Sequence, residues 1–435
     1  MLFIYTPSIT SRVQYIFNLL LTELLGLEYR LTNQKDEFSQ YDGIRLVYDK
    51  SPMEEELFLE TAGLLYETGI YPHELHSREI SDLPVIFECS HPLSLLPFDP
   101  FSAAFYMVTR YEEYNRHKKD KYGRFQVTES IAWQGKFLEM PIIHLWAEQL
   151  SRVLLAYFPD LVFTPPDYRF IPTIDIDHLY AYRGRGVIRT LGSACRALLK
   201  GNFEDISTRF RVLSGLDKDP YDIYDYLHLL HLKMKLNPVY FILFANYGGD
   251  DNNISLRDKN FPRILRELDS EQGVGIHPSL SSNKHTERLE SELIGLSKIL
   301  CRDILVSRQH FLKISFPRTY RNLIKMGITD DFSMGFASHM GFRAGIAIPF
   351  NFFDLSKNES TGLRVHPVAI MDVTLMDYLR LSPEKSLETI RRVITTIKAV
   401  NGEFVSLWHN ESLSEAGRWK GWSRVYSEML EMAAE

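Results

Sequence analysis

The seven residues PTIDIDH, at positions 172–178, place two carboxylates at the end of an apolar run. Side chains alternate along a β-strand, so Asp175 and Asp177 share one face of the predicted strand and the isoleucines share the other. Two carboxylates on one buried face repel each other unless a cation or a shared proton lies between them. A divalent metal that binds one carboxylate and leaves the other as a base meets this need. A helix-capping pair or a solvated strand end is the alternative interpretation.

Outward from this segment, strand-like and helix-like stretches alternate to the end of the chain. Strands are expected at residues 170–177, 239–244, 274–277, 304–307, 345–350 and 404–409. A helix is expected to begin at Ser382 with Pro383 in its first turn, and another repeats leucines from Leu289 to Leu300. Such alternation predicts an α/β fold with a parallel sheet or barrel, whose chemistry collects at the carboxyl ends of the strands.

The first 160 residues have a different pattern, with short β-like runs mixed among helical ones. Residues 159–166 contain three prolines in the sequence PDLVFTPP, which suits neither a helix nor a central strand. We therefore expect a smaller N-terminal α/β domain at 1–160, of unassigned role, and a second domain at 161–435.

Histidines recur at the ends of the later strand-like runs. His277 follows GVGI, His310 follows the run ending at Ser307, and His409 follows SLW. Imidazole and carboxylate groups are the usual ligands of zinc and related cations, and a catalytic metal site keeps one position open for water. A single histidine of this kind is more often a buried, hydrogen-bonded residue. Several in register with the two aspartates indicate a metal site.

Two arginines are candidates to pair with Asp175. Arg308 lies at a strand end, and Arg343 lies in GFRAG, where flanking glycines favour a tight loop near a site. Two weaker candidates are Asp372, which ends another apolar run, and the polar loop that contains Asn246 and Asp250.

Composition excludes several classes of function. The chain has 435 residues, with 49 Lys+Arg against 56 Asp+Glu and a net charge of −7, so no basic surface favours nucleic acid as a partner. Three widely spaced cysteines predict neither a disulfide framework nor a cysteine-based zinc site. No apolar stretch has the length of a transmembrane helix or the flanks of a signal peptide, and we expect a cytoplasmic protein.

The order of these motifs resembles a known family. TxDxD at 173–177, GxH at 275–277, an arginine at 308 and LxH at 407–409 are similar to the motifs of the NodB-homology polysaccharide deacetylases, carbohydrate esterase family 4. The segments SRQHFL, DDFSMGFA, GFRAG and LWHN resemble a divergent bacterial branch that carries an extra N-terminal domain. RYEEY at 110–114 and KYGRF at 121–125 fit that domain.

This resemblance implies a distorted (β/α)7 barrel with a defined catalytic set. Asp175 would be the general base, Asp177 and His277 metal ligands, and His409 the general acid. The better-known members place a second histidine one helical turn after the first, whereas Pro-Ser-Leu-Ser follows His277 here. The third ligand is then His310, His285 or absent. We favour His310 because a strand end delivers it to the barrel mouth.

The function expected from these residues is metal-dependent hydrolysis of an amide in an N-acetylated sugar or glycan precursor. Zinc is the expected metal, with cobalt, nickel and manganese as alternatives. Competing interpretations are a catalytically inactive sugar-binding relative, a metal-dependent glycosyltransferase that uses D-x-D, and a hydrolase of another C–N bond. The sugar and the oligomeric state are left open by the sequence.

Overall fold

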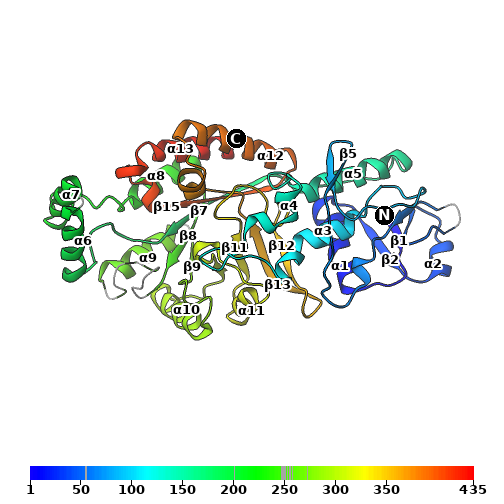
Figure 1. Cartoon of the computed structure of the whole chain (residues 1–435), viewed down its shortest axis with the longest axis horizontal. Helices are drawn as coiled ribbons and strands as arrows, with labels where there is room; N and C mark the ends of the chain where they lie inside the picture. The colour runs from blue at the N-terminus through cyan, green and yellow to red at the C-terminus, as the bar shows by residue number, and fades with distance from the viewer. Residues whose placement is uncertain are drawn as a thin grey trace.

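A nine-stranded mixed sheet forms the centre of the computed structural model (Figure 1), in the order β12-β13-β11-β10-β9-β8-β7-β15-β14. Its strands are β7 (Arg169–Ile176), β8 (Val239–Leu243), β9 (Val274–His277), β10 (Val306–Ser307), β11 (Asp330–Met334), β12 (Phe350–Asp354), β13 (Glu359–Pro367), β14 (Ile370–Met371) and β15 (Glu403–His409). All neighbours are parallel except the β12–β13 pair. The edge strands β12 and β14 do not pair with each other in the described residues, so the sheet is an open, curled half-barrel. The expected mixed α/β class is confirmed.

Around this sheet lie α8 (Tyr224–Met234), α9 (Asn260–Glu271), α10 (Thr286–Leu300), α11 (Arg318–Lys325), α12 (Pro383–Ala399) and α13 (Trp422–Ala434). The helices α6 (Val187–Leu199) and α7 (Phe203–Leu213) pack against each other at one end of the molecule, away from the strands (Figure 1). Short helical turns follow several strands: η5 (His310–Leu312), η6 (Thr374–Tyr378), η7 (Asn410–Leu413) and η8 (Gly417–Trp419). The helix expected at Ser382 is α12, because the Ser382 side chain accepts the Lys385 backbone N–H and Pro383 occupies the first turn. Its apolar stripe, which includes Ile390, Ile394 and Ile397, is buried.

A second, four-stranded parallel sheet lies near the N-terminus, in the order β2-β1-β3-β4. The strands are β1 (Leu2–Tyr5), β2 (Tyr29–Thr32), β3 (Arg45–Asp49) and β4 (Phe58–Glu60), with a separate hairpin of β5 (Arg78–Ile80) and β6 (Leu83–Val85). Around them are α1 (Ser11–Phe17), η1 (Asn18–Leu24), α2 (Lys35–Ser39), η2 (Leu64–Tyr66), α3 (Pro100–Val108), η3 (Tyr111–Tyr114), η4 (Val127–Glu129), α4 (Ile131–Gln134) and α5 (Ile142–Tyr157). The two parts share one apolar core, in which Tyr15 packs 5.0 Å from Phe353 between ring centroids.

One strand prediction is wrong. Residues 345–349 form a buried loop, and the strand begins at Phe350 as β12, which pairs with β13. Gly345 has φ +70°, which interrupts an extended chain, and the Ala347 backbone N–H donates to His144 Nε2 at 3.0 Å. The apolar character of this run reflects burial between the two parts of the chain instead of a place in the sheet.

The structure describes residues 1–435 except 54–55, 200, 246–250, 252, 254–255, 257 and 272. Within this described portion, every helix is too short or too polar to cross a membrane.

Candidate metal and catalytic site

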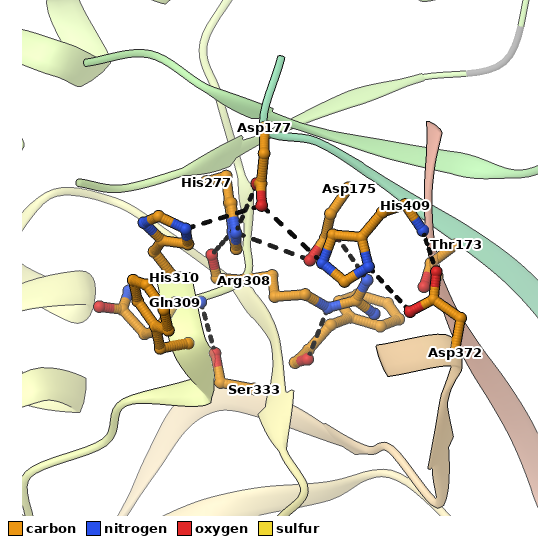
Figure 2. A network of polar contacts seen from close by, with 12 residues as sticks. Thr173, Asp175, Asp177, His277, Arg308, Gln309, His310, Ser333, Asp372 and His409 are labelled. Carbon is orange, nitrogen blue, oxygen red and sulfur yellow. Dashed lines mark hydrogen bonds and ion pairs between the residues drawn. The ribbon is translucent and has the colours of Figure 1, made fainter. Parts of the chain in front are cut away.

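The parallel sheet brings three of the predicted residues to one edge. Asp175 in β7 is the register partner of His409 in β15, and His277 ends β9, the second strand on the other side of β7. The carboxyl ends of parallel strands lie at the same edge of a sheet, which explains how residues more than 200 positions apart meet. Figure 2 shows Asp177 facing the imidazoles of His277, His310 and His409.

Asp177, His277 and His310 form a compact group of possible metal ligands, whose ligand atoms all lie within 4.8 Å of one another. Asp177 Oδ1 is 3.4 Å from His277 Nε2, and Asp177 Oδ2 is 3.7 Å from His310 Nε2. The buried Asp177 Oδ1 has no hydrogen-bond partner among the described residues. An orphaned carboxylate oxygen beside two imidazole nitrogens fits a divalent cation, because nitrogen and oxygen donors suit zinc and its neighbours.

The distal ring nitrogens of both histidines are already engaged. His277 Nδ1 donates to the Arg308 carbonyl at 2.5 Å, and His310 Nδ1 lies 2.9 Å from Asp251 Oδ1. A proton held on Nδ1 leaves the Nε2 lone pair free for a metal, and a carboxylate partner raises the basicity of the ligand. Asp251 was missed by the sequence analysis because no apolar run delivers it. The predicted Asn246 and Asp250 lie outside the described residues.

The charges of Asp177 and the imidazoles around it shift one another's pKa values. Burial opposes ionisation of Asp177, but His310, His277 and His409 hold its pKa well below the usual value. Burial alone would lower the pKa of His310, yet Asp177 and Asp251 raise it to about 9. Burial lowers the pKa of His277. A cation that binds His310 Nε2 would have to displace a proton from this imidazole, so we expect metal affinity to rise with pH.

Asp175 is fixed by a buried arginine. Arg308 Nη1 donates to Asp175 Oδ1 at 2.8 Å, and Arg308 Nε donates to the Phe332 carbonyl at 2.9 Å. The guanidinium carbon lies 4.4 Å from the centre of the Phe241 ring, a cation–π contact. Because Arg308 occupies one carboxylate oxygen, the other, Oδ2, is left 3.6 Å from His277 Nε2 at the edge of the metal cluster.

His409 is held by Asp372, one of the weaker sequence candidates. His409 Nδ1 lies 2.8 Å from Asp372 Oδ1, while the His409 backbone N–H donates to Oδ2 at 2.8 Å and Ser412 Oγ donates to the same oxygen at 2.5 Å. Its Nε2 is 3.9 Å from Asp177 Oδ2. Burial opposes the charge, but Asp372, Asp177 and Asp175 raise the pKa of His409 to about 10. The raised pKa favours the protonated form of this imidazole at neutral pH.

The sequence offered Arg343 as a second possible partner of Asp175, but the structure pairs it with Glu113. Arg343 Nη2 and Nε donate to Glu113 at 2.6 and 2.9 Å, and Arg110 Nε donates to Glu113 Oε1 at 2.8 Å. All three side chains are buried, with Arg343 and Glu113 each 3% exposed. The pair joins the N-terminal part to the loop after β11. Sequence alone could not choose between the two arginines because partner choice depends on contacts across the whole chain.

We expect Glu113→Gln to lower the free energy of unfolding by about 3–5 kcal/mol, because it leaves the buried Arg343 guanidinium without a counter-charge, whereas Arg110 keeps Glu112 at 2.7 Å. Burial opposes the charge of Glu113, but Arg343 and Arg110 lower its pKa, so this contribution is present at neutral pH and is lost as pH falls through the folded-state pKa. Denaturant titrations at neutral and acidic pH measure both effects. Glu388→Gln, in an exposed pair with Lys385, is the matched control and should change stability by less than about 1 kcal/mol.

His285 lies outside the group of possible metal ligands formed by Asp177, His277 and His310. It precedes the first residue of α10, its side chain is 54% exposed, and its Nδ1 lies 3.5 Å from Glu287 Oε1. Of the two histidines offered for the third ligand position, the structure brings His310 to Asp177 and leaves His285 at a helix start. His310 lies in the turn η5 directly after β10, so the end of a strand directs its side chain inward. His285 follows no strand of this kind.

A cavity of about 680 Å³ opens over this cluster, and its lining includes Asp175, Asp177, His277, His310 and His409. Residues 120–128 of the N-terminal part contribute another wall. Arg124 holds this wall in place, because it pairs with Asp120 at 2.6 Å and donates to the Phe311 carbonyl at 3.1 Å. The volume lies in the range of small-molecule sites, roughly 300–1,000 Å³.

The comparison with known proteins gives one match to a family model and several solved structures of low sequence identity. Residues 2–159 match the model of a family of unknown function, DUF7033. No curated protein matches the chain. Among solved structures, a candidate polysaccharide deacetylase from Mycobacterium smegmatis is 13% identical, with a TM-score of 0.40, and the match covers 62% of this chain and 84% of that one. PuuE allantoinase is 10% identical, with a TM-score of 0.40 and coverage of 62% and 88%. The polysaccharide deacetylase Bc1974 from Bacillus cereus is 11% identical, with a TM-score of 0.29 and coverage of 61% and 87%.

Proposed function

We propose that this chain is a metal-dependent hydrolase that removes the acetyl group from an N-acetylated sugar or glycan precursor. The observation that carries the proposal is the shared cavity, which holds a three-residue metal-ligand group, an arginine-fixed aspartate and an aspartate-held histidine. The motif order TxDxD, GxH and LxH adds the resemblance to NodB-homology deacetylases. We infer that the curled sheet corresponds to the distorted (β/α)7 barrel of that family.

Asp177, His277 and His310 would hold the cation through the carboxylate and the two Nε2 atoms. A divalent metal in such a site polarises a carbonyl and lowers the pKa of water. Asp175 accepts a proton from the attacking water at Oδ2, the oxygen that Arg308 leaves free. As the water oxygen bonds to the acetyl carbon and the C–N bond breaks, His409 gives its Nε2 proton to the departing nitrogen. The products are acetate and the free amine.

A specific contact favours hydrolysis over the glycosyltransferase alternative. In a D-x-D transferase the carboxylates serve a nucleotide-bound metal, whereas here Arg308 occupies Asp175 and leaves only Asp177 beside the histidines. The inactive sugar-binding alternative predicts an incomplete ligand group. The geometry of Asp177, His277 and His310 supports an active site instead.

The direct test is release of acetate from N-acetylated sugars by the full chain loaded with zinc, cobalt, nickel or manganese. We expect release that depends on metal and is abolished by chelator. Metal binding without hydrolysis of any acetylated glycan would favour the inactive relative, and hydrolysis of another C–N substrate, such as an imide or amidine, would correct the substrate class.

Two further sequence predictions are retained as proposals. A division near residue 160 is supported by the DUF7033 match over residues 2–159 and by the separate four-stranded sheet. The cytoplasmic location stays a prediction. Limited proteolysis with mass spectrometry would test the division, since cleavage near residues 159–166 is expected.

Asp372→Asn should move the alkaline limb of kcat/KM to lower pH, by roughly 1–3 pH units. The pKa of His409 is raised to about 10 largely by Asp372, so without that charge the imidazole loses its proton at lower pH and cannot act as the acid. A bound cation would lower the value in both proteins, so the comparison is between variant and wild type. Rates from pH 5 to 11 give the shift. Asp303→Asn, at an exposed position, is the control. If the alkaline limb of the kcat/KM profile does not move in Asp372→Asn, His409 is not the proton donor.

A further inference from the structure

A second cavity, of about 1180 Å³, adjoins the metal site and is lined by several cations. Lys121 and Tyr122 line both cavities, so the two meet at this loop of the N-terminal part. Asp251, whose Oδ1 lies 2.9 Å from His310 Nδ1, also faces the second cavity. A substrate whose acetyl group lies at the metal cluster would therefore extend toward this second space.

The decisive residue in this cavity is Lys313, which is buried yet has no counter-charge. It is only 7% exposed, lines the cavity, and takes part in no ion pair among the residues the structure describes. A methyl group added to Gly123 would lie 3.5 Å from its Nζ, which places the ammonium group against the loop that carries Lys121 and Tyr122. An ammonium group that lines a cavity without an acidic partner is available to an anionic ligand.

The field around Lys313 is not balanced by nearby acids. Burial lowers the pKa of Lys313, Lys284, Arg318 and Lys119 lower it further, and Asp120 raises it. Asp120 already pairs with Arg124 at 2.6 Å.

The acids that line the cavity are also engaged. Asp251 faces His310 and accepts the Leu280 backbone N–H at 3.0 Å. Glu292 accepts the Ser279 backbone N–H at 3.0 Å. The exposed Glu287 lies 3.5 Å from His285. The cations at the Lys313 end therefore keep their charge available for a ligand.

We propose that this cavity is a subsite for an anionic group, a phosphate or carboxylate, on the N-acetylated substrate, with Lys313 as its buried contact and Lys121 and Lys284 at its rim. This inference rests on the proposed function and narrows its substrate to acidic glycan precursors. It also gives the N-terminal part a role, because its loop at 120–128 lines the first cavity and two of its residues, Lys121 and Tyr122, line both. Charge-assisted contacts to a phosphate or carboxylate are stronger than contacts to a neutral hydroxyl group.

The test is calorimetric titration of the full chain carrying Asp177→Asn in chelator, so that no metal contributes. The probes are N-acetylglucosamine, N-acetylglucosamine 6-phosphate and N-acetylglucosaminuronic acid. We expect one or both acidic probes to bind roughly 10- to 100-fold more tightly than the neutral sugar, and which one does so separates phosphate from carboxylate. The preference should weaken with added salt.

Lys313→Met should remove this preference without lowering the melting temperature, because the Lys313 ammonium group takes part in no ion pair among the described residues and the methionine keeps most of the apolar stem. The exposed Lys325→Met is the matched control and should keep the preference. If Lys313→Met does not fold, the surface double variant Lys121→Ser/Lys284→Ser provides the test. It should lower the binding affinity for the acidic probes severalfold. Equal binding of neutral and acidic probes, or a preference that survives loss of Lys313, overturns the subsite.

The two proposals fail separately. Acetate release from neutral sugars with no preference for acidic ones would overturn the subsite alone. A Lys313-dependent preference in binding with no acetate release from any substrate would overturn the hydrolase proposal alone.

Discussion

Asp175→Asn is expected to reduce kcat/KM for acetate release by roughly 10²–10⁴-fold, the usual contribution of a positioned general base. An amide nearly matches the carboxylate in shape, but it cannot accept the proton of the attacking water. Arg308 donates to Oδ1, which the asparagine oxygen can replace, so the fold should survive. Steady-state rates with the metal-loaded chain measure the loss.

Metal content separates this effect from a damaged metal site. Asp177, His277 and His310 are unchanged in Asp175→Asn, so metal bound per chain should stay close to that of the wild type. Asp225→Asn, whose side chain is 85% exposed, is the control for loss of one carboxylate and should keep full activity. A rate within a few fold of the wild type would show that another group removes the proton.

The part of the site that the sequence predicts is the part set by local rules. Alternation in β7 places Asp175 and Asp177 on one face, and the apolar runs of β9 and β15 deliver His277 and His409 to the carboxyl edge. The choice of His310 over His285 followed the same rule. The structure brings these residues together, and the sequence could predict this because the information lies within a few positions of each one.

Long-range pairing explains what the sequence does not predict. Asp251 reaches His310 across 59 positions, and Glu113 meets Arg343 across 230, and neither spacing leaves a mark in the local pattern. The loop 345–349 resembles a strand because it is buried between the two parts, whereas β12 and β13 form a hairpin that no prediction included. Burial alone produces an apolar run, so it does not distinguish a central strand from a buried loop.

Among the variants considered, replacement of the proposed metal ligand Asp177 should lower metal affinity most. Asp177→Asn is expected to weaken zinc binding by more than about 100-fold, beyond the 10- to 100-fold typical of an outer partner. Asp177 supplies the negative charge of the ligand group, and its carboxylate faces all three imidazoles. Competition with a chromogenic chelator measures the dissociation constant.

Asp251→Asn should lower zinc affinity less than Asp177→Asn does. Its carboxylate holds His310 Nδ1 but lies outside the ligand group, so zinc affinity should fall by only about 10- to 100-fold. Thermal unfolding gives a second measurement, because a ligand at 100 times its dissociation constant stabilises the folded chain by about 2.7 kcal/mol. Added zinc should therefore raise the melting temperature of the wild type, raise that of Asp251→Asn less, and leave Asp177→Asn unchanged. Equal zinc affinity in all three proteins would mean that the cation binds elsewhere, and the hydrolytic proposal would lose its metal centre.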